Sequence, residues 1–134
     1  MITTKPKPNK DAVAVSSIDA LRSLPAEVKE ATFGERWFRR HVNKNGTLGG
    51  FVESTAKATE FVIISSGSLV LENAVVCNAA RLDDATVSGD ARVYECARLS
   101  DGIAINGKTE VFSDTSYCTI IRENGVCRVV QRQL

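Results

Sequence analysis

The sequence predicts an all-β fold in which residues 52–118 form a parallel β-helix of about four coils. Three observations support this prediction. Aliphatic residues recur at every sixth position, a small or β-branched residue follows most of them after four positions, and turn-forming residues lie in between. A fixed internal period is typical of a solenoid, in which each repeat packs only against its neighbours.

The first position of each six-residue rung is expected to point into a three-sided coil of about 18 residues. One step in the series is five residues long. This step predicts a deletion at a corner, with either Ala85 or Thr86 turned inward. The first positions are Val52, Ala58, Ile64, Val70, Val76 and Leu82, and after the short step Val87, Val93, Leu99, Ile105, Val111 and Tyr117.

The fifth position of each rung also faces inward, but it has less room and is therefore small or β-branched. The third and fourth positions turn the corner, where Gly, Asn and Asp accept left-handed backbone angles. A β-sandwich predicts alternation with period two and does not explain a spacing of six. The fifth positions are Ala56, Val62, Ser68, Ala74, Ala80, Ala91, Ala97, Ile103, Thr109 and Thr115, and the expected corner residues are Gly67, Asn73, Gly89, Asp90, Asp101, Gly102 and Gly107.

The clearest part of the repeat, VSGDAR-VYECAR-LSDGIA at residues 87–104, resembles the hexapeptide-repeat family. That resemblance implies a left-handed parallel β-helix, and the best-known members of the family are trimeric acyltransferases. The preceding segment WFRRHVNKNGTLGGFVE (Trp37–Glu53) also resembles short hexapeptide-repeat proteins of bacteria and phages, for which no chemistry is implied. The resemblance is therefore specific for fold and says little about function.

Each end of a solenoid needs a cap, because an open end exposes apolar core and unpaired strand edges. Residues 1–51 are expected to form the N-terminal cap, beginning with a flexible segment, Met1–Lys10. Two short helices and a hairpin with a type I′ turn at Asn45-Gly46 complete this interpretation. The helices are expected at Ser17–Ser23 and Pro25–Ala31, and the hairpin strands at Arg36–Val42 and Thr47–Val52.

The C-terminal cap is expected in residues 119–134. Thr119–Arg122 and Val126–Val130 flank Asn124-Gly125, a pair that favours the type I′ turn of a two-residue hairpin. We expect this hairpin to lie as a flap over the last coil.

Function is expected on the outward positions, which are the second and sixth of each rung. Ile63, Leu69, Leu71 and Val75 are outward yet apolar, and all belong to the first two coils. A group of this kind predicts either a subunit interface or a surface that the N-terminal helices cover.

A second outward group contains aromatic residues. Tyr94 and Phe112 occupy the same position in successive coils and are expected to stack, with Arg81 and Arg98 beside them on the same face. Aromatic and arginine residues are enriched at interface hot spots, so this group predicts a partner-binding surface. The alternative is that the rings only shield the sheet beneath a terminal segment.

Composition excludes several classes of function. The 17 basic and 16 acidic residues give a net charge of +1, so a nucleic-acid partner is not indicated. There is no apolar run of about 18 residues and no secretory signal, so we expect no membrane span and a cytoplasmic location. The four cysteines form no C-x-x-C pair and only one histidine is present, so free thiols are expected, with neither a metal site nor a cofactor.

The leading hypothesis is a non-catalytic binding protein, a homo-oligomer (trimer or dimer) that acts through contact with another protein. The resemblance suggests a phage or mobile-element inhibitor of host or defence machinery as its setting. The alternative is a minimal hexapeptide-repeat acyltransferase with His41 as general base. No other catalytic motif is present, and a lone histidine beside Trp37 and Phe38 is more often a packing residue. A third class, a structural element of a filament or virion, is compatible with the solenoid alone.

Overall fold

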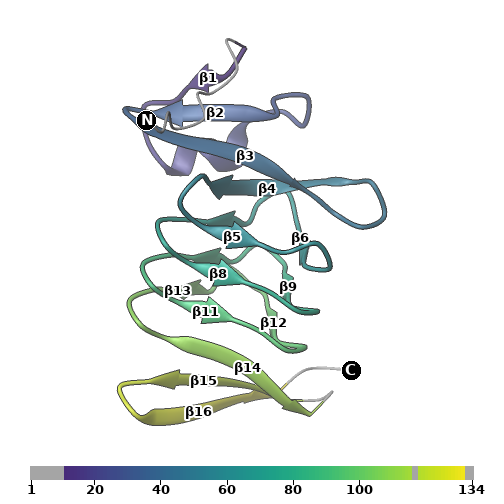
Figure 1. Ribbon diagram of the computed structural model, residues 1–134, viewed down its shortest axis with the longest axis vertical. Coiled ribbons are helices and arrows are strands. Elements are labelled where there is room, and N and C mark those ends of the chain that lie inside the picture. The colour runs from purple at the N-terminus through teal and green to yellow at the C-terminus, as the bar shows by residue number, and fades with distance from the viewer. Residues whose placement is uncertain (1–10, 116–117, 132–134) are drawn as a thin grey trace, which may run out of the picture.

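The computed structural model describes residues 11–115 and 118–131. They form an all-β β-solenoid of about six turns, with coils of about 18 residues stacked along the long axis of the molecule (Figure 1). Within these ranges there is no α-helix, and the one helical segment is a short 3₁₀ helix, η1 (Asp19–Ser23).

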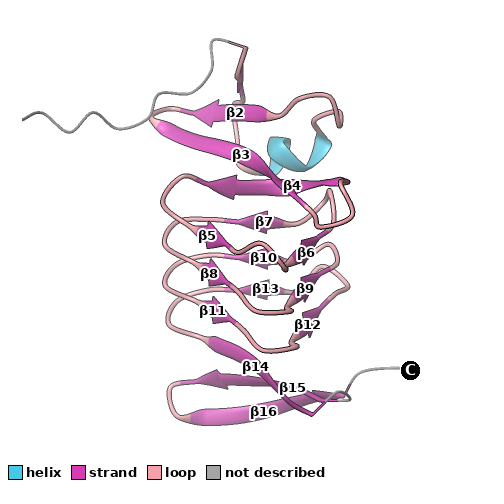
Figure 2. Cartoon of the chain, turned by 45° about the vertical axis from the view of Figure 1, so that its right-hand side comes forward, coloured by secondary structure: helices cyan, strands magenta, loops and turns pink. Residues whose placement is uncertain are grey.

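Strands of two residues form most rungs of the solenoid, and longer strands lie at both ends (Figure 2). The N-terminal strands are β1 (Val13–Ala14), β2 (Glu30–Phe33), β3 (Arg36–Val42) and β4 (Leu48–Glu53). The short rungs are β5 (Lys57–Ala58), β6 (Ile63–Ile64), β7 (Leu69–Val70), β8 (Val75–Val76), β9 (Arg81–Leu82), β10 (Thr86–Val87), β11 (Arg92–Val93), β12 (Arg98–Leu99) and β13 (Ala104–Ile105). The C-terminal strands are β14 (Glu110–Thr115), β15 (Cys118–Glu123) and β16 (Val126–Gln131).

Three sheets form the sides of the prism. Sheet A has the order β1-β2-β3-β4-β7-β10-β13, sheet B the order β16-β15-β14-β11-β8-β5, and sheet C the order β12-β9-β6. Coils pair in parallel within the solenoid, whereas β2 to β4 and β14 to β16 pair antiparallel. The predicted number of four coils includes only the part of the stack in which the strands pair in parallel. The antiparallel strands continue sheets A and B beyond it, so the stack has about six turns.

The register of the parallel pairs follows the six-residue repeat. In sheet B, Ala58 pairs with Val76, Val76 with Val93, and Val93 with Val111. Side chains at one position of the repeat therefore lie above one another in successive coils. This alignment allows a single pattern of inward and outward residues to hold along the whole prism.

The five-residue step lies at the corner between β9 and β10. Ala85 is the residue turned inward there, with an exposed fraction of 1%. Thr86 instead faces outward, where its hydroxyl accepts a hydrogen bond from Arg22 of the N-terminal segment. The deletion is absorbed without breaking the parallel pairing, because Thr86 and Val87 still pair with Leu69 and Val70.

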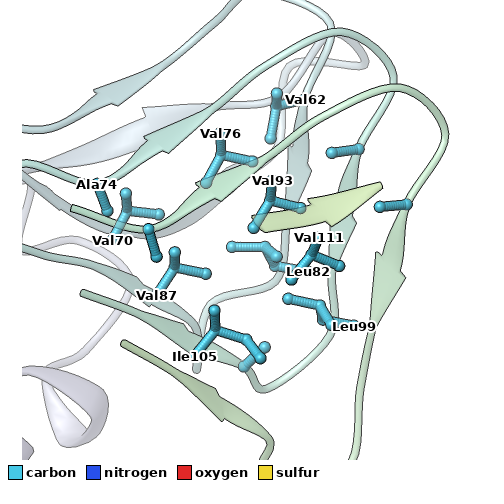
Figure 3. Close-up of a cluster of buried hydrophobic side chains, with 14 of the residues drawn as sticks. Val62, Val70, Ala74, Val76, Leu82, Val87, Val93, Leu99, Ile105 and Val111 are labelled. Atoms are coloured by element: carbon cyan, nitrogen blue, oxygen red, sulfur yellow. The ribbon is translucent and has the colours of Figure 1, made fainter. Parts of the chain in front are cut away.

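Aliphatic side chains fill the prism from end to end (Figure 3). Each fully buried side chain of this kind contributes roughly 1.5–3 kcal/mol relative to an exposed one. Ile121 of β15 is 2% exposed and belongs to the same core, so the C-terminal hairpin closes the lower end. The core residues labelled in Figure 3 are Val62, Val70, Ala74, Val76, Leu82, Val87, Val93, Leu99, Ile105 and Val111.

A left-handed backbone conformation recurs at the third position of the rungs, more regularly than residue type suggests. Of the expected corner residues, Gly67, Asn73 and Asp90 do not adopt it. Side chains of the preceding coil support such corners by accepting hydrogen bonds from them. For example, Asn78 Oδ1 accepts the backbone N–H of Glu95 at 2.9 Å. The residues with positive φ at this position are Glu72, Asn78, Asp84, Gly89, Glu95, Asp101 and Gly107.

The expected pair of N-terminal helices is only partly present. The first segment, Ser17–Ser23, contains η1, but the second helix, at Pro25–Ala31, is wrong. Its last residues begin β2, which pairs with β3 through a turn at Gly34, where φ is +60°. This pairing buries Ala31 opposite Phe38, and a short isolated helix has too little stability of its own to compete.

Both expected hairpins are present, but their turns differ. Asn124 and Gly125 both have positive φ, as the expected type I′ turn requires. Between β3 and β4 only Gly46 does, and Asn45 instead accepts the N–H of Thr47 at 3.1 Å, so the type I′ prediction is wrong there. β15 of the C-terminal hairpin pairs with β14, so the hairpin extends sheet B while its Ile121 side chain covers the end of the core.

Candidate functional site

Tyr94 and Phe112 stack on the outward side of sheet B, as expected. Val93 and Val111 point into the core, so strand alternation directs the next side chain outward in each case. The two ring centroids are 5.4 Å apart and the ring planes are inclined by 15°. The rings therefore form one stacked pair that spans two successive coils.

Glu110 and Arg122 complete this cluster, and neither was expected beside the rings. The Oε2 atom of Glu110 accepts hydrogen bonds from the Tyr94 hydroxyl at 2.9 Å and from Arg122 Nη2 at 2.8 Å. The Arg122 guanidinium also lies 5.0 Å from the centroid of the Phe112 ring. The repeat carries no signal for Arg122, because its position opposite Glu110 depends on the antiparallel register between β14 and β15.

These contacts shift the titration of the three polar groups. The hydrogen bond from Arg122, followed by that from Tyr94, holds the pKa of Glu110 below its ordinary value. The same bond to Glu110 raises the pKa of Arg122. Burial, and then the hydrogen bond to Glu110, raises the pKa of the Tyr94 phenol. The cluster thus presents a neutral phenol, a carboxylate and a guanidinium in fixed positions at neutral pH.

Arg81 and Arg98 do not lie on this face, contrary to expectation. Both belong to sheet C, where their Nε atoms lie 3.3 and 3.6 Å from Oδ2 of Asp83. The expected grouping placed the second and sixth positions of one rung on the same side. The corner lies between these positions, so the sixth residue already begins the next strand. The two arginines therefore form a separate network on the neighbouring face.

The surroundings of the aromatic pair on sheet B are apolar along one column and positively charged along the other. Cys77 and Ile120 extend the aromatic column above and below the rings. In the second column, Lys57 and Arg92 are exposed and make no ion pair within the described part of the chain. The second column consists of Lys57, Val75, Arg92, Glu110 and Arg122.

Two of the four residues expected at a subunit interface are buried within the chain itself. Leu69 is fully buried and Leu71 is 6% exposed, so the expectation of an exposed group is wrong for them. The N-terminal segment covers them, in line with the second alternative. Ile63 remains 43% exposed on sheet C, and Val75 is half-buried on sheet B. The cluster around the two leucines contains Leu21, Ala31, Phe38 and Phe51.

Arg40 fixes the N-terminal segment over this part of sheet A. Its side chain is 8% exposed, and its guanidinium lies 4.3 Å from the centroid of the Phe51 ring. Burial lowers the pKa of Arg40, partly offset by the charge of Glu27. Backbone carbonyl groups accept hydrogen bonds from the guanidinium, and these bonds hold the cap in place. The carbonyl groups belong to Leu24, Pro25, Val28 and Gly49, at 2.6–3.1 Å.

His41, the candidate general base, makes a structural contact. Its Nε2 atom lies 2.7 Å from the carbonyl oxygen of Val62. A carbonyl only accepts, so Nε2 donates in this hydrogen bond. The contact joins the end of β3 to the chain that enters β6 and gives the half-buried ring a packing role.

Across residues 11–115 and 118–131, no group of three or more His, Cys, Asp or Glu residues is placed to hold a metal ion. The same two ranges contain no helix long and apolar enough to span a membrane. Cys77, Cys96 and Cys127 are not joined by disulfides.

No protein-family model, curated protein or solved structure matches the sequence. The four residues Tyr94, Phe112, Glu110 and Arg122 form the candidate site, which we call the aromatic cluster.

Proposed function

We propose that this protein is a non-catalytic β-helix that acts by binding another protein through sheet B. The observation that carries the proposal is the stack of Tyr94 on Phe112, fixed by the hydrogen bonds of Glu110. Side chains that are already ordered lose little conformational entropy on binding. Aromatic and arginine residues also dominate the energetics of many interfaces. The aromatic cluster combines both properties in one ordered group of side chains.

The charges near the aromatic cluster favour an acidic partner. Arg122 neutralises Glu110, whereas Lys57 and Arg92 project from the same face without an ion pair within the described residues. A partner that places an apolar side chain on the rings and carboxylates beside them complements this surface. Complementary charges raise the association rate and select against other partners.

Capture from a lysate of the cells that express the protein tests the proposal, with the wild type and matched variants as bait. We expect Tyr94→Ala and Phe112→Ala each to weaken binding of the captured protein about thirtyfold or more, since a truncated hot spot costs at least about 2 kcal/mol. Titrations with the purified partner measure the change. Circular dichroism confirms that each variant is folded.

Sheet A supplies the control. Ser88 and Asn106 are outward residues in the same coils as the rings, but they lie on another side of the prism. Ser88→Ala and Asn106→Ala should leave binding nearly unchanged. If these two changes weaken binding and the aromatic changes do not, the functional face is sheet A and the proposal fails.

We further propose that the solenoid is left-handed and that the chain is a hexapeptide-repeat protein. The period of six, with an aliphatic first position and a small fifth position, supports this assignment. A cytoplasmic inhibitor from a phage or mobile element, directed at host or defence machinery, is the setting that we propose for it. A crystal structure tests the handedness, and the identity of the captured partner tests the setting.

A further inference from the structure

The last strand of sheet B leaves one side of its backbone open. β16 (Val126–Gln131) has six residues and, within the described part of the chain, pairs only with β15. Figure 1 shows it at the C-terminal end of the stack, beyond β14 and β15. The other strands at the edges of the three sheets, β1, β5, β6, β12 and β13, have two residues each. β16 is therefore the longest edge strand among the described residues.

β16 lacks the features that usually prevent an edge strand from pairing with another chain. A short length, a proline, a bulge or a covering segment blocks most natural edges. β16 contains no proline and pairs with β15 without a bulge. Val126 is 70% exposed and Cys127 is exposed. In sheet C, by contrast, the side chains of Asn43 and Thr119 hydrogen-bond the two edge strands. The edge of β16 can therefore accept a further strand.

The turn of the C-terminal hairpin determines which backbone groups point to the open edge. Asn124-Gly125 is a two-residue type I′ turn, so the flanking residues Glu123 and Val126 exchange both of their backbone hydrogen bonds. Along an antiparallel pair, hydrogen-bonded and non-hydrogen-bonded positions alternate. Every second residue of β16 therefore directs its N–H and C=O groups away from β15. These residues are Cys127, Val129 and Gln131.

The open edge belongs to the same sheet as the aromatic cluster. Phe112 of β14 pairs with Ile120 of β15, and Ile120 pairs with Val129 of β16. Neighbouring strands lie about 4.8 Å apart, so β16 runs about 10 Å from the strand that carries Phe112. A standard interface covers about 800 Å² of each protein and is several strands wide. One partner can therefore contact the two rings and the edge of β16 at the same time.

We propose that the partner protein adds an extended strand of its own to β16, so that sheet B continues into the partner. This inference rests on the proposed function and specifies how the partner binds. Main-chain hydrogen bonds to an open edge supply affinity, and contacts with side chains supply specificity. Residues 124–134 contain two arginines and no acidic residue, so an acidic segment suits this edge as it suits the rest of the face.

Amide hydrogen exchange, followed by NMR in the full chain, tests the proposal first without a partner. The N–H groups of Cys127 and Val129 should exchange quickly, whereas those of Arg128 and Val130, which point to β15, should be protected. Addition of the purified partner from the capture experiment should slow exchange at Cys127 and Val129 at least about tenfold. Unchanged exchange in the complex overturns the proposal. Protection that is already present in the free chain also overturns it, and protection that grows with concentration identifies a second copy as the occupant.

A proline substitution tests the main-chain hydrogen bonds directly. Val129→Pro removes an N–H group that points to the open edge, and proline is tolerated at such positions of an edge strand. We expect this variant to bind the partner at least about tenfold more weakly, because one acceptor of the added strand loses its donor. Val129→Ala keeps the N–H group and is the matched control, which should bind nearly as well as the wild type. Circular dichroism confirms that both variants are folded.

The same titrations separate a failure of this inference from a failure of the proposed function. If Tyr94→Ala weakens binding but Val129→Pro binds as well as Val129→Ala, the partner uses the aromatic cluster without adding a strand, and only this inference is wrong. If no partner is captured, or if neither Tyr94→Ala nor Phe112→Ala weakens its binding, the proposed function fails and this inference fails with it.

Discussion

The side-chain amide of Asn43 occupies the place of a missing strand beside Ile64. Its Nδ2 donates to the Ile64 carbonyl oxygen at 3.0 Å, and its Oδ1 accepts the Ile64 N–H at 2.9 Å. At the opposite edge of sheet C, Thr119 Oγ1 accepts the N–H of Arg98 at 3.2 Å and lies 3.4 Å from its carbonyl oxygen. Unpaired strand edges invite aggregation. At each edge of sheet C, one polar side chain pairs with backbone groups that would otherwise be open to another strand.

The first prediction concerns this cap. Asn43→Ala leaves both backbone groups of the buried Ile64 without their partner, and one buried unsatisfied group costs about 1–3 kcal/mol. We expect the free energy of unfolding to fall by about 2 kcal/mol or more in urea titrations. Asn106→Ala, at an exposed asparagine on sheet A, should change it by less than about 0.5 kcal/mol. Equal effects of the two changes would contradict the role of Asn43 as a cap.

The second prediction compares Leu71, which the N-terminal segment covers on sheet A, with Val75, which is half-buried on sheet B. Leu71 is 6% exposed beneath the N-terminal segment, so Leu71→Lys buries an ammonium group without a partner. We expect it to cost at least about 3 kcal/mol of stability or to prevent folding. Val75→Lys, at a half-buried position on sheet B, should cost about 1 kcal/mol or less. Thermal melts of both variants decide the point, and a fully stable Leu71→Lys protein would show that the segment does not cover this face.

The repeat was predictable because every coil imposes the same demand on its residues. An inward residue must fit one narrow prism, so the period of six and the small fifth position appear directly in the sequence. The stack of Tyr94 on Phe112 followed from the same logic, since both occupy the second position of successive rungs. The choice between Ala85 and Thr86 stayed open in the sequence, because either is small enough to turn inward.

Features outside the repeat were less predictable. The position of Arg122 depends on the register of an antiparallel hairpin, which the parallel repeat does not determine. The burial of Leu71 depends on what covers it, and an outward apolar residue suits a second subunit as well as a terminal segment. The cap formed by Asn43 depends on a bulge in β3, which has no clear sequence signal.

The third prediction concerns stability at acid pH. Burial alone would raise the pKa of Glu53, but the hydrogen bonds from Arg36 and from the N–H of Glu72, with the charge of Arg36, outweigh it and lower the pKa. The folded state therefore releases this proton more readily than the unfolded state. The resulting stability is present above the unfolded pKa of about 4.3 and is lost as the pH falls through the lower folded value.

Glu53→Gln removes the titrating group and keeps its shape. We expect the variant to be less stable than the wild type at neutral pH, and its free energy of unfolding to depend less on pH below about 4.3. Urea titrations of the variant and the wild type from neutral to acid pH measure the free energy of unfolding and its dependence on pH. Glu35→Gln, at an exposed glutamate, is the control and should keep the wild-type slope. Parallel slopes for Glu53→Gln and the wild type would show that another carboxyl group is responsible.

The fourth prediction concerns His41. Because Nε2 donates to the Val62 carbonyl group, we expect His41→Ala to cost about 1 kcal/mol of stability and to leave partner binding intact. A general base contributes about 10²–10⁴-fold to a reaction rate. Acyl transfer that is measurable in the wild type and lost by that factor in a folded His41→Ala variant would contradict the binding proposal and favour the acyltransferase hypothesis.

The last prediction tests which arginines face the partner. Arg92 is exposed in the column beside the aromatic cluster without an ion pair among the described residues, whereas Arg81 lies on sheet C against Asp83. An exposed charge at the rim of an interface acts mainly on the association rate and on its salt dependence. We therefore expect Arg92→Ala to slow association with an acidic partner and to flatten the dependence of the rate on ionic strength. Arg81→Ala should change neither. Surface plasmon resonance at several salt concentrations measures the association rate and its salt dependence. A larger effect of Arg81→Ala than of Arg92→Ala would show that the partner binds sheet C and not sheet B.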